Sequence, residues 1–204
     1  MFIVGIAGGS GSGKTTFAKK IVKRAASDEV IHLHQDSYYL PTPPKHIYVK
    51  DKPNFDHPDS FDWPLLRTQL REIRNGKGVA APTYNFSTSS RLIETEAFAP
   101  AKVCIFDGIY ALWDEEIRSM LDLKVFLHVD ADIRFIRRLH RDVKERGRNI
   151  DSIIAQYYDT VRPMHRQFLE STRQFADLMV GEESDIPAEV IASKIRAVIS
   201  GENP

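Results

Sequence analysis

The chain opens with FIVGIAGGSGSGKTT at residues 2–16, an apolar run that leads directly into a glycine-rich loop. From Gly8 to Thr15 the loop matches the pattern G-x-x-x-x-G-K-[ST], and the residues that follow, Phe17 to Val22, favour a helix. Glycines allow successive backbone N–H groups to surround a phosphate at a helix N-terminus, where the helix dipole also favours negative charge. The segment therefore predicts a strand, a phosphate-binding loop and a helix, rather than a glycine-serine turn that happens to contain a lysine.

Within this loop, Lys14 is predicted to bridge the β- and γ-phosphates of a nucleoside triphosphate, and Thr15 to place its hydroxyl on Mg²⁺. The candidate residues for binding the triphosphate are Gly8, Gly9, Ser10, Gly11, Ser12, Gly13, Lys14, Thr15 and Thr16.

The composition bounds the class of protein. The length of 204 residues suits a single domain over 1–204, and Lys+Arg and Asp+Glu are both 28, so there is no excess positive charge for a nucleic-acid partner. The one cysteine, Cys104, lies in an apolar run and is expected to be a buried free thiol in a reducing compartment. The first strand starts at Phe2 and no apolar run reaches bilayer length, so we expect a cytoplasmic protein without a membrane partner.

Short apolar runs alternate with longer helical patterns, which predicts an α/β fold with three layers, in which helices flank a parallel, doubly wound sheet. The strands are expected at residues 2–7, 30–33, 103–106, 125–129 and 177–180. The helices are expected at about 14–26, 64–74 and 186–200, the last opened by Asp185 as its cap, with Pro187 in the first turn.

Three segments interrupt this alternation. Residues 37–63 are crowded with proline and aromatic residues and predict an irregular loop, whereas residues 79–98 predict a small β-hairpin flap. Residues 138–150 are rich in arginine and predict a lid. Insertions after the carboxyl ends of strands lie over the ligand crevice of an open α/β sheet, so the first two segments are expected to bind the second substrate.

Two aspartates follow predicted strands. Asp107 takes the place where a second carboxylate of a phosphate-loop protein meets Mg²⁺, with a structural strand end as the alternative. Asp36 can orient an attacking hydroxyl and accept its proton, with a turn or helix cap as the alternative. Thr15, Asp36 and Asp107 are the candidate metal ligands. His32 and His34 share a strand face, but the sequence offers no evident third and fourth ligand, so packing or hydrogen bonding is favoured over metal binding.

Basic residues recur through the lid segment, at Arg134, Arg137, Arg138, Arg141, Lys144, Arg146 and Arg148. On a helix several of them share one face, so their guanidinium groups converge. The alternative is a solvated face with the i,i+4 pairs Arg138–Asp142 and Arg141–Glu145. The glycine between Arg146 and Arg148 favours a mobile lid that closes on a triphosphate. Such a lid could neutralise charge in the transition state.

A series of motifs in this order resembles the phosphoribulokinase/uridine kinase family, and within it the uridine–cytidine kinases. The motifs are the phosphate loop, Gln35–Tyr39, Asn54–Asp62, Pro82–Phe86, Asp107–Ile109 and Arg137–Arg148. The resemblance implies transfer of the γ-phosphate of ATP, with Mg²⁺, to the 5′-hydroxyl of uridine or cytidine, and Asp36 as the base. It also assigns Arg141 and Arg146 to the phosphates, so the candidate catalytic residues are Asp36, Lys14, Arg141 and Arg146. It also implies a homo-oligomer, since the family often forms symmetric assemblies.

The same resemblance implies a substrate pocket. Asp56 and Arg138 would bind the ribose hydroxyls, and Phe55 and Phe86 would enclose the base unless they simply belong to the core. The implied substrate-binding residues are Tyr39, Phe55, Asp56, Tyr84, Phe86, Ser89, Arg138, Arg148 and Gln156.

Some features depart from the family pattern. Ser89 stands where many uridine–cytidine kinases carry a histidine that reads the pyrimidine, and the turn from Val180 to Asp185 lacks the usual Ile-Pro-Arg-Gly-like sequence. A kinase of the same fold for another hydroxyl acceptor, such as nicotinamide riboside or pantothenate, is therefore the alternative. A phosphate-loop switch that acts by partner binding is a further alternative, although a guanine-reading Asn-Lys-x-Asp segment is absent from the sequence.

Overall fold

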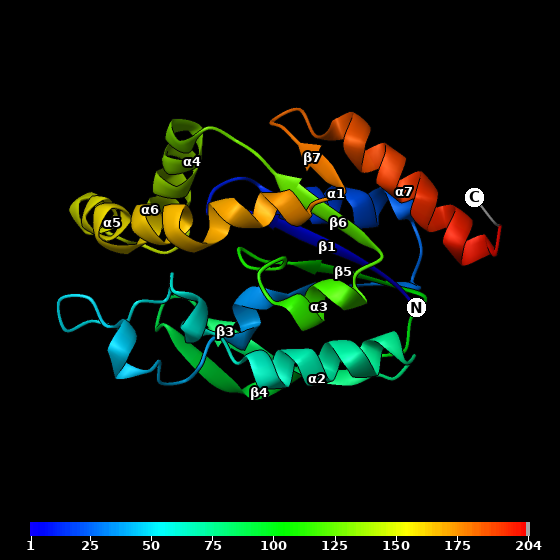
Figure 1. Ribbon diagram of the computed structural model, residues 1–204, viewed down its shortest axis with the longest axis horizontal. Coiled ribbons are helices and arrows are strands. Elements are labelled where there is room, and N and C mark those ends of the chain that lie inside the picture. Colours follow the sequence, from blue (N-terminus) through cyan, green and yellow to red (C-terminus); the bar gives the residue numbers. More distant parts are fainter. Residues whose placement is uncertain (203–204) are drawn as a thin grey trace.

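A five-stranded parallel sheet of order β2-β5-β1-β6-β7 lies at the centre of the structure, a computed structural model that describes residues 1–202 (Figure 1). The strands are β1 (Phe2–Gly8), β2 (Val30–His34), β5 (Val103–Asp107), β6 (Leu123–Leu127) and β7 (Leu178–Val180). The predicted α/β class and parallel sheet are confirmed. The strand that carries the phosphate loop, β1, is central, so both neighbouring strands deliver residues to the loop.

Helices cover both faces of the sheet, and the alternation of side chains along β1 shows why. Ile3 and Ala7 pack into the hydrophobic cluster on one face, and Val4 and Ile6 into the cluster on the other. The first cluster is completed by α2 (Trp63–Arg74) and α3 (Glu115–Met120), the second by α1 (Lys14–Ala25) and α7 (Asp185–Ser200) (Figure 1). Cys104 is fully buried in the first cluster, as predicted, and burial raises the pKa of its thiol to about 12.

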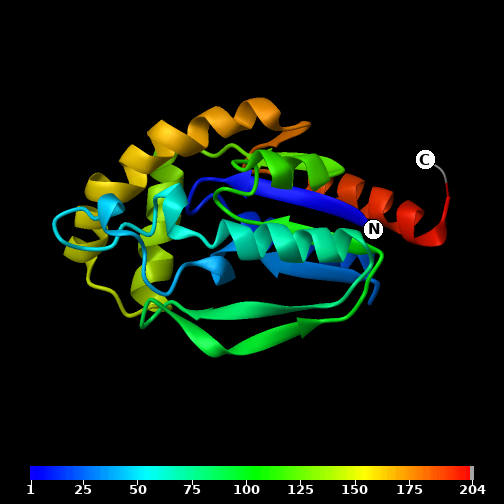
Figure 2. The same cartoon turned by 60° about the horizontal axis from the view of Figure 1, so that its bottom comes forward.

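The predicted hairpin forms a separate two-stranded antiparallel sheet of β3 (Val79–Asn85) and β4 (Ser90–Phe98). Figure 2 shows it running below α2, with its turn near the end of the molecule that carries α4 and α5. The turn places Ser89 in the left-handed region, with φ of 51°. The flap therefore extends from the core toward the lid segment.

The irregular segment before α2 is closed at its base. Tyr39 and Phe61 form an isolated antiparallel bridge, and their rings stack with centroids 4.3 Å apart. Between them the chain forms short 3₁₀ turns at Lys45–Ile47 and Pro58–Ser60. Asp62 then caps α2 by accepting a hydrogen bond from the backbone N–H of Leu65, as its place before Trp63-Pro64 favours.

A long helical region follows β6. It consists of α4 (Ala131–Lys144), α5 (Ile150–Gln156), α6 (Arg162–Met164), π-helical turns at Tyr157–Val161 and His165–Leu169, and a 3₁₀ segment at Glu170–Phe175. Pro163 lacks a backbone N–H, and a proline inside a helix interrupts the i→i−4 pattern. This accounts for the wider turn immediately before it.

The structure corrects several expected boundaries. The strand predicted at 125–129 is β6, Leu123–Leu127, and α7 begins at Asp185 after Ser184, rather than using Asp185 as its cap. Asp185 instead forms ion pairs with Lys20 and Arg24 of α1. Within residues 1–202, no helix is both long and apolar enough to cross a membrane.

Candidate active site

The phosphate loop has the geometry of an anion-binding turn. Gly11 and Gly13 have φ values of 82° and 92°, and a Cβ on Gly11 would lie 2.2 Å from the carbonyl oxygen of Arg134, so that position requires glycine. Helix α1 begins at Lys14 without a side-chain cap, which leaves its first N–H groups directed at the loop. The Ser12 hydroxyl is buried and has no hydrogen-bond partner among the described residues. The unpaired N–H groups at the start of α1 fit a bound phosphate.

Lys14 points back across the loop, where its Nζ donates to the carbonyl oxygen of Gly9 at 3.1 Å. Burial lowers the pKa of Lys14 to about 8, although the charges of Asp36 and Asp107 oppose that shift. A cation that has lost much of its hydration is well prepared to bind phosphate oxygens. The position fits the predicted role of Lys14.

Thr15 and Asp107 meet at the carboxyl ends of β1 and β5. The Thr15 hydroxyl donates to Oδ2 of Asp107 at 2.7 Å, while Oδ1 contacts His34 Nδ1 at 2.7 Å and His32 Nε2 at 3.0 Å. Burial opposes ionisation of Asp107, but its hydrogen bonds with the two histidines outweigh burial and hold its pKa well below the usual value. Hydroxyl and carboxylate oxygens are ligands that Mg²⁺ accepts, so Thr15 and Asp107 fit a magnesium ion.

Asp36 lies in a 3₁₀ turn, Gln35–Tyr38, that directly follows β2, rather than in the strand itself. Burial raises the pKa of its carboxyl group, while Lys14 and the lid arginines Arg141 and Arg146 oppose the shift. Asp36 lines the same cavity as Lys14, Arg141 and Arg146. A carboxylate with a raised pKa is a better proton acceptor than an exposed one.

A second polar cluster of the cavity is centred on Asp56, which the sequence predicts to bind the acceptor. Its Oδ2 accepts hydrogen bonds from Thr160 at 2.7 Å and from Gln156 at 3.1 Å, and its backbone carbonyl accepts one from the Tyr110 hydroxyl at 2.7 Å. Gln156 is the last residue of α5 and Thr160 lies in the π-helical turn that follows, and both reach the same oxygen. Asp56 is therefore held in one orientation.

Aromatic rings line the same side. Tyr39 packs against Phe55 and Tyr84 at centroid distances of 5.5 and 5.1 Å, and Tyr84 contacts Phe86 at 5.3 Å. Phe86 is 39 % exposed, so it is not a core residue, whereas Phe55 is half-buried beside the core. The guanidinium of Arg146 lies 4.3 Å over the Phe86 ring, which joins the lid to the flap.

The lid arginines converge as the sequence predicted, and of the two i,i+4 pairs considered there, Arg138–Asp142 forms and Arg141–Glu145 does not. Arg141 contacts Asp142, its neighbour in the chain, rather than Glu145, and Arg137 pairs with Glu182 in the turn after β7. The helix ends at Lys144, and Gly147 takes a left-handed conformation with φ of 61°, which turns Arg148 back toward Asp142.

One cavity of about 1210 Å³ connects these groups. The predicted site residues that line it are Ser10, Gly11, Gly13, Lys14, Thr15, Thr16, Asp36, Tyr39, Phe55, Asp56, Tyr84, Phe86, Ser89, Asp107, Arg138, Arg141, Arg146, Arg148 and Gln156. Gly8, Gly9 and Ser12 support the loop from behind the cavity wall. A phosphate donor and a hydroxyl acceptor could therefore bind in one continuous space.

The sequence predicted packing or hydrogen bonding for His32 and His34 and offered the pair Arg138–Asp142, but it did not predict the other partners of these residues or point to Thr160. The pair His32 and His34 supports Asp107, Thr160 orients Asp56, and Asp142 contacts several lid arginines. The His-x-His pattern before Asp36 could have indicated the role of His32 and His34, but Asp107, which they contact, lies on another strand. The position of Asp142 within an arginine-rich helix could have indicated that it pairs with the lid arginines.

Comparison with known proteins places the chain in a class. The model of the phosphoribulokinase/uridine kinase family matches residues 3–186, and the chain belongs to that family. The phosphate loop, the Asp107 carboxylate and the arginine-rich lid define it as a kinase of the phosphate-loop fold.

Curated relatives are similar over nearly the whole length. The chain is 45 % identical to the uridine kinase of Lactobacillus helveticus over 97 % of this chain and 95 % of the relative. It is 44 % identical to that of Staphylococcus epidermidis and 40 % identical to that of Deinococcus deserti, each over 97 % of both chains.

Solved structures share the fold at much lower identity. A phosphoribulokinase from Rhodobacter spheroides matches with a TM-score of 0.65 and 12 % identity, over 88 % of this chain and 69 % of the other. A D-glycerate 3-kinase from Cryptococcus neoformans matches with a TM-score of 0.62 and 16 % identity, over 90 % and 87 %. These likenesses establish the fold alone.

Proposed function

We propose that this protein is a uridine–cytidine kinase that transfers the γ-phosphate of ATP to the 5′-hydroxyl of uridine or cytidine. The observation that carries the proposal is the single cavity in which Lys14 and Asp36 lie on the donor side and Asp56 lies on the acceptor side. The full-length similarity to uridine kinases supports the choice of acceptor.

The donor is bound by the loop and the N-terminus of α1. Backbone N–H groups around Gly11 and Gly13 surround the phosphates, and Lys14 binds their oxygens. Thr15 and Asp107 would hold Mg²⁺, with Asp36 the third predicted ligand. When bound, this ion neutralises charge on the β- and γ-phosphates.

The acceptor is bound by Asp56 and the aromatic groups. A carboxylate accepts hydrogen bonds from two vicinal hydroxyl groups, so Asp56 suits the ribose diol, with Arg138 beside it through Gln156. Phe55, Tyr84 and Phe86 offer flat apolar faces for a planar base. Tyr39, Ser89 and Arg148 complete the pocket.

Chemistry then requires positioning and charge neutralisation. The 5′-oxygen forms a bond to the γ-phosphorus as the bond from that phosphorus to the β,γ-bridging oxygen breaks, and ADP leaves with the electron pair of the broken bond. Asp36 accepts the proton of the 5′-hydroxyl, while Lys14, Arg141 and Arg146 stabilise the negative charge of the transferred group.

Release of ADP from Mg²⁺ and ATP, with purified protein and uridine, cytidine, adenosine, nicotinamide riboside and pantothenate offered in parallel, tests the proposal. Turnover with uridine or cytidine well above that with the other acceptors is expected. If only nicotinamide riboside or pantothenate supports turnover, the assignment of the donor site stands, but uridine and cytidine are not the acceptors. Cytoplasmic location and assembly into a homo-oligomer stay predictions.

A further inference from the structure

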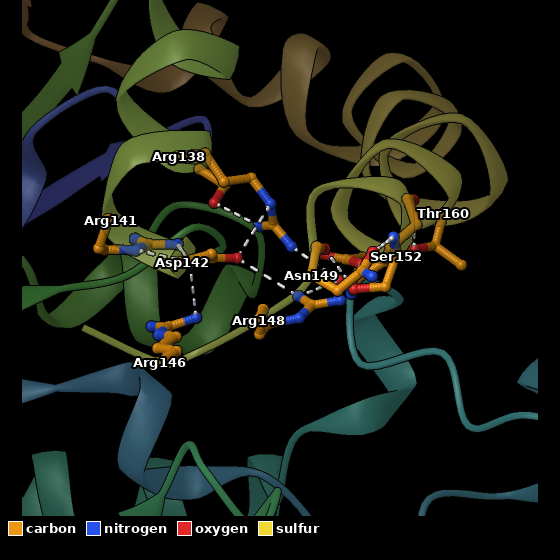
Figure 3. Close-up of polar contacts among 11 residues, drawn as sticks. Arg138, Arg141, Asp142, Arg146, Arg148, Asn149, Ser152 and Thr160 are labelled. Carbon is orange, nitrogen blue, oxygen red and sulfur yellow. Dashed lines mark hydrogen bonds and ion pairs between the residues drawn. The ribbon is translucent and has the colours of Figure 1, made fainter. Parts of the chain in front are cut away.

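The carboxylate of Asp142 lies at the centre of the lid arginines, which we define as Arg138, Arg141, Arg146 and Arg148 (Figure 3). Its Oδ1 accepts two contacts from Arg141, from Nε at 3.0 Å and from Nη2 at 2.9 Å, and lies 3.4 Å from Arg146 Nη1. Its Oδ2 lies 3.3 Å from Arg148 Nη1 and 3.7 Å from Arg138 Nε. One carboxylate thus contacts every member of the group.

The backbone reinforces this arrangement. The N–H of Arg148 donates to the carbonyl oxygen of Asp142 at 3.0 Å, which closes the turn through Gly147. The Asp142 side chain is completely inaccessible to solvent. Burial opposes its ionisation, but the charges of Arg138, Arg141 and Arg146 outweigh burial and hold its pKa below the usual value. Asp142 is therefore a buried anion that neutralises part of a local excess of positive charge.

The four lid arginines line the same cavity as Asp36. Arg138 donates to the Ser10 hydroxyl of the phosphate loop at 2.8 Å. The Arg146 guanidinium lies over the Phe86 ring. The group therefore lies beside both the phosphate loop and the aromatic side of the cavity, and all its members contact one carboxylate.

The lid arginines are linked to the carboxylate of Asp56 through the side-chain amide of Gln156. Arg138 Nη2 and Arg148 Nη1 both donate to Oε1 of Gln156, at 3.0 and 2.7 Å, and Nε2 of Gln156 donates to Asp56 at 3.1 Å. A displacement of the arginines would therefore also disturb the support of Asp56.

We propose that Asp142 is a positioning residue for phosphoryl transfer, the shared counter-ion that sets the placement of the lid arginines and limits their attraction for anions before the triphosphate is bound. An uncompensated group of four guanidinium ions would repel one another and spread toward solvent. With Asp142 between them they remain directed at the cavity, so less reorganisation accompanies the reaction.

The test replaces Asp142 with Asn, which keeps the shape of the side chain and removes its charge. We expect kcat to fall about 10- to 100-fold, as for other small misplacements of catalytic groups. We also expect inorganic pyrophosphate to bind about threefold more tightly or better, because the arginines have lost their counter-ion. A merely structural role would weaken both turnover and pyrophosphate binding, so the opposite directions of the two changes identify the positioning role.

Asp132→Asn is the matched control, since Asp132 lies on the first turn of the same helix and is exposed. It should leave both quantities unchanged. Asp142→Glu keeps the charge but moves it by one methylene, so pyrophosphate affinity should stay near that of the parent while kcat remains reduced. If Asp142→Asn does not fold, Asp142→Glu decides instead: a reduced kcat with pyrophosphate affinity near that of the parent supports the inference, and a parent-like kcat or weaker pyrophosphate binding overturns it.

A kcat of Asp142→Asn close to that of the parent, or pyrophosphate binding that is unchanged or weaker, overturns the inference. The turnover measurement rests on the proposed function, whereas pyrophosphate titration by calorimetry needs no acceptor. If uridine is not the acceptor, the parent protein shows no turnover with uridine. The pyrophosphate affinities of the parent and the variants can still be compared in that case.

Discussion

The imidazole of His34 lies 2.7 Å from the carboxylate of Asp107, the residue directly opposite it in the register of β2 and β5. His32 contacts the same oxygen at 3.0 Å, and the other oxygen accepts the Thr15 hydroxyl. With the carboxylate as acceptor, both histidines donate an N–H to it. Asp107 is thus held in one orientation from two sides, as carboxylates beside metal ions commonly are.

Removal of this support should weaken the response to Mg²⁺. In the double variant His32→Ala, His34→Ala we expect the Mg²⁺ concentration for half-maximal activity to rise about 10- to 100-fold. Binding of Mn²⁺ in the presence of ATP, followed by electron paramagnetic resonance, should weaken in parallel. His140→Ala, at an exposed histidine of α4, is the control. An unchanged metal requirement would mean that the histidines only pack.

Asp36→Asn tests the base. Because general-base catalysis contributes about 100- to 10,000-fold, we expect a loss of kcat of that order, with the ATP dissociation constant nearly unchanged. Steady-state turnover and calorimetric titration with ATP measure the two quantities. Asp59→Asn changes an exposed carboxylate of the acceptor loop and should leave kcat nearly unchanged. If the two variants turn over equally well, Asp36 is not the base.

Lys14 makes ATP binding depend on pH. Its pKa is lowered from 10.5 to about 8 in the free protein, so above that pH most of the lysine is neutral. Bound phosphates favour the charged form and raise the pKa again, so ATP binding takes up a proton and its affinity falls as the pH rises past about 8.

Calorimetry in buffers of different ionisation enthalpy measures this uptake. It should be small near a pH of about 6.5, where Lys14 is already charged, and larger near a pH of about 8.5. Lys14→Arg retains the charge over this range and should show no uptake from this position. Equal uptake at both pH values in the parent protein would contradict the assignment.

The left-handed conformation of Gly147 can be tested by a substitution that adds no new contact. Its φ is 61°, and a Cβ at this position would have no atom within 4 Å, so Gly147→Ala should act only through backbone strain, at a cost of about 1–2 kcal/mol. Gly76→Ala is the matched variant, since Gly76 has φ of 73° and equally open space at the end of α2. Both should lower the free energy of unfolding similarly, but only Gly147→Ala should lower kcat.

A substitution of Ser89 tests whether the flap turn contacts the nucleobase of the acceptor. Burial raises the pKa of Tyr84 to about 12, and a hydrogen bond with Ser89 opposes that shift, so the two side chains are close. Ser89→Gly suits the φ of 51° and removes only the hydroxymethyl group. We expect the KM for uridine to rise about 2- to 10-fold, while the KM for ATP is unchanged. An equal rise in both would indicate a general disturbance of the flap.

The donor side was predictable because its signals are local. The phosphate loop, its strand and its helix are consecutive, and Gly8 to Thr15 specify the turn through backbone conformation. The class of the sheet followed from the alternation of apolar runs with helical patterns. The boundaries of β6 and α7 were less accurate, because apolar residues such as Val129 continue past the last ladder hydrogen bonds.

The supporting contacts were not predictable because they join distant residues. His34 and Asp107 are 73 positions apart, and Thr160 and Asp56 are 104 positions apart. Asp142 is close to its partners in sequence, and the i,i+4 rule offers Arg138 and Arg146. It does not offer Arg148, which turns back toward Asp142 after the left-handed Gly147.

The bridge between Tyr39 and Phe61 has a consequence for how this protein could change over evolutionary time. It joins the two ends of the loop that carries Phe55 and Asp56, and the stacked rings seal that junction against the core. A loop closed at its base can be lengthened, shortened or exchanged while the strands beneath it keep their register. The part of the proposed acceptor site that this loop carries can therefore be exchanged, whereas the phosphate loop beside it requires glycine at Gly11.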